Sequence, residues 1–549
     1  MTENPETETA GRVKRLEAAV EALVRRIEPA ILRAREKQAS TEGLGQAESH
    51  GLAWFATYAS ALRAIVQYGL ALERCTRLTE IESLLIAIGG GEYLDQVLGG
   101  IPMSQSEFAR TRDLLSPDMF EALLADDDIR NAIQHGNTPA NRSRLVTIWR
   151  EANTDPHLGD PATDDTVEAI RLEMRKFVAN EISPHAHFWH LNNSYIPQDV
   201  LDQLGALGVF GLTLPEEYGG SGLSKVAMCV VTEELSKGYL GVGSLGTRSE
   251  IAAELISSGG TEEQKRKWLP LIASGACVPT AVFTEPDVGS DLASLKTRAS
   301  LKDGFYEVTG AKSWITHAGR ANLMTLLVRT DPDDKGYRGL SLLLAEKTAG
   351  TVDAHFRDEG LSGSEIEVLG YRGMKEFELS FDAFRVPMAN LLGEREGQGF
   401  KQLMRTFEAA RIQTAARAVG VAEAAFSLSW RYATDRVQFG QPIVRFDRIS
   451  DKLAMMAAEI LICRQLVYAS ARQKDANIRC DVEAGMAKLL AARVAWACAD
   501  SCVQIHGGNG FALEFEASRL LCDARILSIF EGAAEIQADI ISRGLLSTK

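Results

Sequence analysis

Apolar residues near the N-terminus recur every three or four positions, which is the spacing of one helix face. This stripe consists of Val13, Leu16, Val20, Leu23 and Ile27. Pro29 follows it, and proline lacks the N–H that a helix interior needs, so we expect the helix to break or kink there. Further helical patterns run through 51–75, 78–88 and 104–125.

The texture of the sequence then changes twice. The segment 152–165 is rich in Asp, Pro and Thr, which is typical of a linker, and helical patterns resume at 167–182. From Val278 to Pro387, short β-branched runs alternate with Gly, Asp and Lys, which predicts a compact antiparallel sheet or barrel of about 110 residues. Long helical patterns follow at 398–434, 449–474 and 481–505. We therefore expect a mainly α chain with a central β domain.

Length and charge narrow the class of protein. A chain of 549 residues is expected to form two to four domains. Its formal net charge of −15 disfavours nucleic acid and anionic membranes as partners. The apolar stretch 51–72 is interrupted by Arg63 and Gln67, so we expect a packed helix there and no membrane span.

The cysteines and the N-terminus indicate a cytoplasmic protein. The eight cysteines form no CxxC pair and are spread along the chain, except that Cys498 and Cys502 have the i, i+4 spacing of one helix face; this is typical of reduced, buried thiols. The first residues, MTENPETETAGRVKRLE, contain no apolar segment of the kind that a secretory signal requires.

Several common site motifs are absent or lack their context. His185, His187 and His190 have no nearby Cys or second carboxylate that would complete a metal site, so no metal is expected. The glycines at 89–91 and in HGGNG at 506–510 do not follow a strand within a βαβ unit. No phosphate-binding loop or GxSxG motif occurs.

One carboxylate stands out from its surroundings. In RILSIFEGAAEIQ at 525–537, Glu531 follows Ile529 and Phe530 and precedes small residues. A carboxylate that loses water to apolar neighbours has a raised pKa and can accept a proton near neutral pH. The alternative interpretation is a helix N-terminus, where a glutamate stabilises the helix dipole.

Two longer segments resemble one known family. They are AVFTEPDVGSDLASLKT at 281–297 with KSWIT at 312–316, and QIHGGNGFALEFEASRLLCDARILSIFEGAAEIQ at 504–537. PEEYGGSGLS at 215–224, GTEEQKRKWLP at 260–270, VPMANLLG at 386–393 and DRVQFGQPI at 435–443 occur in the matching order. Over 166–549 the chain resembles the acyl-CoA dehydrogenase family of flavoproteins.

The resemblance implies a fold, a cofactor and a division into domains. The expected fold is an α domain, a β-barrel and a C-terminal helical bundle, here with an N-terminal helical extension, and the implied cofactor is FAD. The expected domains are the extension at 1–155, the α domain at 166–277, the β-barrel at 278–395 and the bundle at 396–549.

It also implies a reaction. Such enzymes remove an α-proton and a β-hydride from an acyl-CoA, and an electron-transfer flavoprotein then takes the electrons. Glu531 matches the position of the family's base. Some relatives carry the base immediately before an arginine, but here Ala410 precedes Arg411. Glu531 is therefore the expected catalytic residue.

Other roles are implied position by position. Residues resembling flavin-ring and ribityl contacts are Phe283, Thr284, Gly289, Ser290, Trp314 and Thr316. Residues resembling contacts to the FAD of a neighbouring subunit or to its diphosphate are Arg436, Gln438, Phe439, Gln504, Gly507 and Gly508. Ser290 and Arg411 resemble residues that meet CoA. Ala533 departs from the threonine usual after EG, and Cys522 replaces a common arginine.

An arginine suggests the kind of acyl group. In the family, the helix ahead of the GTEEQK turn lines the acyl pocket, and here that helix carries Arg248. A buried arginine facing a substrate carboxylate forms a charge-assisted pair, so we expect a dicarboxylic acyl-CoA. The alternative is a pair with Glu250 or Glu254. Arg405 and Arg417 are further candidates for the same duty.

Alternatives remain within and beyond this interpretation. A glutaryl-CoA type enzyme would share the carboxylate contact but also decarboxylate, and other short or branched acyl-CoAs are possible substrates. Acyl-CoA oxidases differ in admitting oxygen, and relatives that respond to DNA alkylation bind nucleic acid. The extension is expected to dock on the C-terminal bundle and leave a homodimer; the alternative is a domain that recruits a partner.

Overall fold

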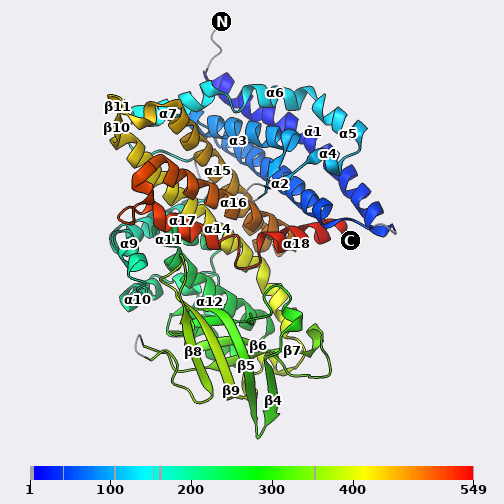
Figure 1. The fold of residues 1–549 in the computed structure, drawn as a ribbon, viewed down its shortest axis with the longest axis vertical. Helices are drawn as coiled ribbons and strands as arrows, with labels where there is room; N and C mark the ends of the chain where they lie inside the picture. The colour runs from blue at the N-terminus through cyan, green and yellow to red at the C-terminus, as the bar shows by residue number, and fades with distance from the viewer. Residues whose placement is uncertain are drawn as a thin grey trace. The chain divides into compact units, whose positions relative to one another are not determined.

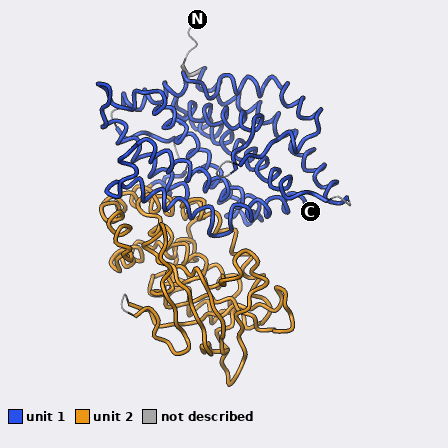
Figure 2. Tube along the Cα trace, viewed as in Figure 1, with its two compact units in different colours: residues 1–168, 418–549 blue, residues 169–417 orange. Residues whose placement is uncertain are grey.

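The computed structural model describes residues 5–40, 43–103, 107–152, 154–159, 163–351 and 354–547. The chain forms two compact units (Figure 2). Unit 1 combines Met1–Glu168 with Ala418–Lys549, and unit 2 is Ala169–Arg417. Part of the expected linker, residues 153 and 160–162, lies outside the described residues.

Unit 1 begins with three long helices, α1 (Pro5–Ala39), α2 (Gln46–Arg74) and α3 (Glu80–Gly99). Of the break or kink expected at Pro29, the break is wrong, because α1 continues through this residue. The buried stripe of α1, which includes Val13, Leu16 and Leu23, packs on α2 and α3. This burial outweighs the hydrogen bond that proline removes.

The predicted helix at 104–125 is also corrected. Residues 104–106 lie outside the described residues, and the rest is divided among short elements. These are β1 (Ile101–Pro102), β2 (Phe108–Ala109), α4 (Thr111–Leu114) and α5 (Pro117–Leu124). Ser116 accepts a hydrogen bond from the Met119 N–H and caps α5, so a new helix begins there. Helices α6 (Asp127–His135) and α7 (Pro139–Ala152) complete the extension.

The C-terminal part of unit 1 is a helical bundle. It consists of the end of α14 (Gly399–Asp435), α15 (Asp447–Asp475), α16 (Asp481–His506), α17 (Ala517–Ile526) and α18 (Ala534–Leu546). Helix α15 is long and apolar enough to cross a membrane by length and composition alone, but most of its apolar part is buried within the protein. It is therefore a core helix of the bundle.

The extension packs directly on this bundle. Helix α2 lies beside α15 and α18, and α3 lies beside α15 (Figure 1). The Tyr93 hydroxyl donates to Glu459 across 3.3 Å, and the Arg142 Nε donates to Asp451 across 2.6 Å. The Trp149 ring meets the edge of Phe426, with 5.7 Å between the centroids. The expected docking of the extension on its own bundle is confirmed.

Unit 2 begins with helices. They are α8 (Asp165–Phe177, which starts in unit 1), α9 (Ser183–Leu191), α10 (Gln198–Ala206), α11 (Lys225–Gly238), α12 (Leu240–Gly259) and α13 (Glu262–Ala273). The GTEEQK motif is the start of α13. Thr261 caps it by accepting from the Gln264 N–H, and the Gln264 side chain accepts from the Thr261 N–H.

A curled seven-stranded sheet follows (Figure 1). Its strands are β3 (Pro279–Val282), β4 (Arg298–Lys302), β5 (Phe305–Thr316), β6 (Leu323–Arg329), β7 (Leu340–Glu346), β8 (Leu361–Ile366) and β9 (Glu376–Pro387). The order is β3-β6-β4-β5-β9-β8, with β7 also pairing with β6. The expected antiparallel pattern needs one correction, because β6 pairs in parallel with β3 and β4.

Candidate functional site

A buried ion pair fixes the loop between β3 and β4. Lys312 on β5 is completely buried, and its ammonium donates to the Phe283 carbonyl across 2.8 Å. The same ammonium lies 3.1 Å from the Glu285 carboxylate. Glu285 also accepts from the N–H groups of Lys296 and Thr297, at 2.7 and 2.8 Å. The side chain of Glu285, near the start of the TEPDVGSDLASLKT segment, is therefore bonded to the end of the same segment.

The pair sets the charges of both groups. Burial raises the pKa of the Glu285 carboxyl, but the Lys312 ammonium and the hydrogen bonds from Thr297 and Lys296 outweigh it and leave this pKa lowered. Burial lowers the pKa of Lys312 to about 8, against the opposing effect of Glu285. At neutral pH the two groups are an ion pair inside the protein.

A β-bulge turns Trp314 out of the sheet. The register between β5 and β9 shifts between Lys312 and Ile315. Trp314 lies in this bulge with φ 61° and is 56 % exposed. A left-handed conformation is unusual for a bulky residue and costs on the order of 1–3 kcal/mol. The bulge therefore presents an indole ring to the surroundings at an energetic cost, as bulges beside functional sites do.

The other expected flavin contacts of unit 2 differ in their exposure to solvent. Thr284 accepts from the Ser313 N–H across 3.0 Å, which joins the two motifs of unit 2. The Thr316 hydroxyl is buried and donates to Glu376 across 2.8 Å, so only its acceptor capacity is left for a ligand. Gly289 and Ser290 lie exposed in the loop after β3. Of the expected flavin contacts in unit 2, Trp314, Gly289 and Ser290 are therefore exposed, whereas Thr316 is buried.

Unit 1 carries the second group of expected cofactor residues. Arg436, Gln438 and Phe439 belong to the hairpin of β10 (Val437–Gln438) and β11 (Gln441–Pro442). Phe439 has φ 49° and is 94 % exposed. Gln504 is exposed near the end of α16, and a Cβ added to Gly507 (φ 59°) or Gly508, which follow it, would meet no atom within 4 Å. Open main chain and exposed donors of this kind fit the diphosphate and ribityl parts of FAD.

Glu531 lies in the loop between α17 and α18 and is half-buried. Its φ of 54° is left-handed, and Gly532 follows with φ 90°. The alternative of a helix N-terminus is not supported, because α18 begins at Ala534 and the acidic residue of its first turn is Glu535. Ala533, where a threonine was expected, is the N-cap residue of α18 and gives no side-chain cap.

A buried polar cluster lies among α12, α14 and the segment before β9. Arg417 is completely buried and donates to Ser244 and Thr414 across 2.8 and 2.6 Å. Tyr371 is also buried. Besides burial, which raises the pKa of its hydroxyl, the charges of Arg248 and Arg417 lower this pKa and the charge of Glu376 raises it. We call Arg248, Arg417, Tyr371 and Ser244 the arginine cluster.

The positive charges of the arginine cluster affect the pKa values of two buried side chains, Tyr371 and His317. Burial raises the pKa of Tyr371, and the two arginines oppose that rise, so its hydroxyl keeps its proton. Burial, together with the charges of Arg320, Arg248 and Lys347, lowers the pKa of His317 to about 3. His317 is therefore neutral, and the surroundings favour an added negative charge over another positive one.

The positions of three other charged residues bear on the expectations. Glu250 accepts from Thr213 across 2.9 Å and pairs with Lys225, and a pair of Arg248 with Glu254 stays the alternative interpretation. Arg405 is exposed and does not join the arginine cluster. Arg411 is buried with its guanidinium 5.7 Å from the Phe407 ring centroid. Sequence reasoning missed Tyr371, whose only signal is its place in the GYRG turn.

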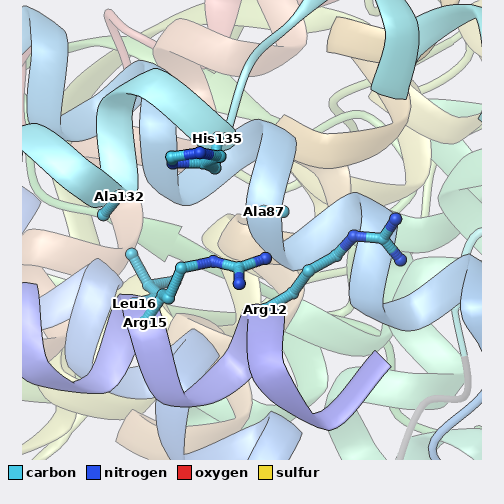
Figure 3. Close-up of a pocket in the computed structure, with 7 residues that line it drawn as sticks. Arg12, Arg15, Leu16, Ala87, Ala132 and His135 are labelled. Atoms are coloured by element: carbon cyan, nitrogen blue, oxygen red, sulfur yellow. The ribbon is translucent and has the colours of Figure 1, made fainter. Parts of the chain in front are cut away.

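The N-terminal extension contains a small cavity whose charged lining residue Arg12 is already paired within the protein. It measures about 10 Å³, room for about one water, and lies among α1, α3 and α6 (Figure 3). Arg12, Arg15 and His135 line it. Arg12 donates to Ser83 across 3.1 Å and pairs with Glu8, so its charge is already compensated. Within the described ranges, no group of His, Cys, Asp and Glu side chains could hold a metal.

Comparison with known families accounts for the chain from residue 164 onwards. The family models for the acyl-CoA dehydrogenase N-terminal, middle and C-terminal domains match residues 164–276, 280–384 and 397–546. The (2S)-methylsuccinyl-CoA dehydrogenase of Cereibacter sphaeroides is 57% identical over 502 residues, which is 91% of each chain. This relative therefore also matches most of the N-terminal extension.

Two solved structures share the fold. Butyryl-CoA dehydrogenase from Megasphaera elsdenii matches with a TM-score of 0.67 and 32% identity, over 71% of this chain and 100% of its own. A glutaryl-coenzyme A dehydrogenase in complex with glutaryl-CoA matches with a TM-score of 0.66 and 31% identity, over 70% of this chain and 95% of its own. With these likenesses and the three domain matches, the chain belongs to the acyl-CoA dehydrogenase family.

Proposed function

We propose that this FAD-dependent enzyme dehydrogenates a short dicarboxylic acyl-CoA. The proposed reaction converts (2S)-methylsuccinyl-CoA to mesaconyl-CoA, as a step of the ethylmalonyl-CoA pathway. The observation that carries the proposal is the arginine cluster, because two arginines in a buried environment favour a bound carboxylate. The 57% identity to a (2S)-methylsuccinyl-CoA dehydrogenase supports the same substrate.

Glu531 is the proposed proton acceptor. The proton on the α-carbon of a thioester is weakly acidic, so its removal needs a carboxylate held at that atom. The Glu531 carboxylate takes this proton while a double bond forms between the α- and β-carbons and hydride leaves the β-carbon. When bound, FAD supplies the hydride acceptor. A backbone N–H next to Glu531 is expected to stabilise the charge that develops on the thioester oxygen.

The remaining residues bind and orient. Thr284, Trp314 and the exposed Ser290 are proposed to hold the flavin ring, and Phe283 and Thr316 to support it. Arg436, Gln438, Phe439, Gln504, Gly507 and Gly508 are proposed contacts of FAD. Arg411 and Ser290 are proposed to meet CoA. Arg248 and Arg417 are the proposed contacts of the second substrate carboxylate.

Anaerobic bleaching of the flavin tests the reaction and the acyl group together. We expect methylsuccinyl-CoA to bleach the enzyme fastest among methylsuccinyl-, succinyl-, glutaryl- and butyryl-CoA. The Glu531→Gln enzyme is expected to retain FAD, with flavin reduction slower by several orders of magnitude. Near-normal bleaching of Glu531→Gln removes the assignment of the base, and fastest bleaching by butyryl-CoA removes the dicarboxylic substrate.

A second candidate is a glutaryl-CoA type reaction. The likeness to a glutaryl-coenzyme A dehydrogenase complexed with glutaryl-CoA favours it, since a carboxylate contact would serve both substrates. The two reactions differ in their products, because a glutaryl-CoA type enzyme releases carbon dioxide. Turnover of carboxyl-labelled substrates with capture of the released label distinguishes them.

The partners are proposals as well. Within this family an electron-transfer flavoprotein is the expected acceptor of the electrons. We also propose a homodimer, because the extension covers α15 and α18, a surface that would otherwise be open to a second dimer. The competing proposal, that the extension recruits another protein, predicts a free face on α1–α7 that binds it.

A further inference from the structure

We infer that Lys488 and Gln537 are positioning residues that hold the Glu531 loop in a strained conformation. The inference rests on the proposed role of Glu531 as the base. It adds two residues that belong to neither the cofactor set nor the substrate set described above.

Lys488 lies on α16 and is 1% exposed. Its ammonium donates to the carbonyl of Gly532 across 2.7 Å. An ammonium removed from water loses several kcal/mol of hydration, so a buried lysine needs strong acceptors. A backbone carbonyl in the loop of the proposed base is one of them.

Gln537 approaches the same loop from the first turn of α18. Its side chain is completely buried, and Nε2 donates to the carbonyls of Glu531 and Gly532 at 3.1 and 3.3 Å. Two consecutive carbonyls therefore accept from two buried side chains on two different helices. Both helices are packed in the bundle, so the loop is held against a rigid support.

The loop needs such support because its backbone is unfavourable. Glu531 has φ 54° and Gly532 has φ 90°, so two consecutive residues lie in the left-handed region. A non-glycine residue there costs on the order of 1–3 kcal/mol and persists only where its surroundings impose it. Release of the two carbonyls would let Glu531 return to an ordinary conformation and turn its carboxylate elsewhere.

Gly532 and Gln537 are matched sterically. A Cβ on Gly532 would lie 2.1 Å from Gln537 Nε2. The amide of Gln537 thus occupies the space that only a glycine leaves, and in that space it reaches the carbonyl of Glu531. The glycine of the FEG sequence is therefore required by this contact as well as by its φ.

The consequence is a separation between binding and proton transfer. A misplacement of a catalytic group by about 1 Å can cost about 100-fold in rate. Loss of either donor should therefore slow flavin reduction and leave the binding of substrate and FAD nearly unchanged. A purely structural role would lower thermal stability and leave the reduction rate of the folded holoenzyme as it was.

The test is stopped-flow flavin reduction by the preferred acyl-CoA with the holoenzyme. For Lys488→Met we expect reduction about 10- to 100-fold slower, with FAD content and substrate affinity within about twofold. Lys488→Arg keeps a donor and should recover part of the rate. Arg142→Met is the matched control, since it removes a partly buried cation of unit 1 that pairs with Asp451; it should lower the melting temperature only.

A second variant keeps the inference testable if Lys488→Met does not fold. Gln537→Leu retains much of the volume and removes both donated hydrogen bonds, and it should slow reduction to a similar extent. Wild-type rates in Lys488→Met or Gln537→Leu, or equal losses in Arg142→Met, overturn the inference. Glu531→Gln is measured in parallel. If it still reduces flavin, the proposed base is wrong, whereas an inactive Glu531→Gln with a normal Lys488→Met removes only the positioning role.

Discussion

The guanidinium of Arg417 donates to the hydroxyl of Ser244 across 2.8 Å, and both side chains are completely buried. The contact joins α14 to α12, the helix that also carries Arg248. The contact holds a buried cation in the arginine cluster, which we propose to bind the second carboxylate of the substrate.

Removal of a guanidinium from the arginine cluster should change substrate selectivity. Arg248→Ala and Arg417→Met are expected to lower kcat/KM for the dicarboxylic substrate, because each loses a charge-assisted contact. The expected decrease corresponds to a loss of about 2–4 kcal/mol of transition-state stabilisation. Activity toward butyryl-CoA should fall much less. Lys401→Ala, an exposed cation on α14, is the control and should change neither value. Equal losses on both substrates would make the two arginines structural.

Gly532→Ala should disable the loop of the proposed base. The new Cβ would meet Gln537 Nε2 at 2.1 Å, and the φ of 90° is strained for alanine. We expect loss of at least about 10-fold in the flavin reduction rate with a modest fall in melting temperature. Gly440→Ala is a control for strain alone, because Gly440 has φ 80° and open space around its Cβ position. A Gly532→Ala enzyme with normal kinetics contradicts this expectation.

Glu285→Gln should destabilise unit 2 and weaken FAD binding. It leaves the buried Lys312 charge without its carboxylate, and breaking a buried pair in this way costs about 3–5 kcal/mol. The double variant Glu285→Gln with Lys312→Met should recover part of the stability, because it removes both charges. Chemical denaturation and FAD titration measure the two effects. A single variant as stable as the double one would show that the pair is not coupled.

Acid should destabilise the protein through His317. Its pKa falls from 6.5 to about 3 in the folded state because it is buried, so below pH 6.5 the unfolded chain binds a proton that the native residue does not. Stability from this residue therefore decreases as pH falls from 6.5 toward 3, by roughly 1.4 kcal/mol per pH unit. His317→Gln should remove about 2 kcal/mol of the loss between pH 7 and pH 5. An unchanged pH dependence would mean that another group dominates.

The full chain should be a homodimer of about 120 kDa, twice the 59.8 kDa of one chain. Deletion of 1–155 should expose the apolar faces of α15 and α18 and lead to tetramers or aggregates. Light scattering on both proteins measures this. A tetramer of the full chain contradicts the proposal, and a stable, active dimer after the deletion favours a domain that recruits a partner.

The residues of the candidate site were proposed from local sequence, and their roles stay predictions. The segments around Thr284, Trp314 and Glu531 are recognised from short runs of residues, such as the glycine that follows Glu531, and such features act within a few residues of each other. The predicted stripe of α1 was confirmed for the same reason, since Val13, Leu16 and Leu23 are buried on one helix face. The break expected at Pro29 does not occur, because packing of α1 on distant helices keeps the helix continuous.

The sequence by itself determined the family, the α–β–α order of the elements and the identity of Glu531 as the candidate base, because each depends on nearby residues in a recognisable pattern. Only the tertiary structure decided which distant residues act on them. Lys488 lies 44 positions from Gly532 and Arg417 lies 173 positions from Ser244, and no local periodicity relates such pairs. Packing of separate helices brings them together, and burial then gives each hydrogen bond and charge its strength.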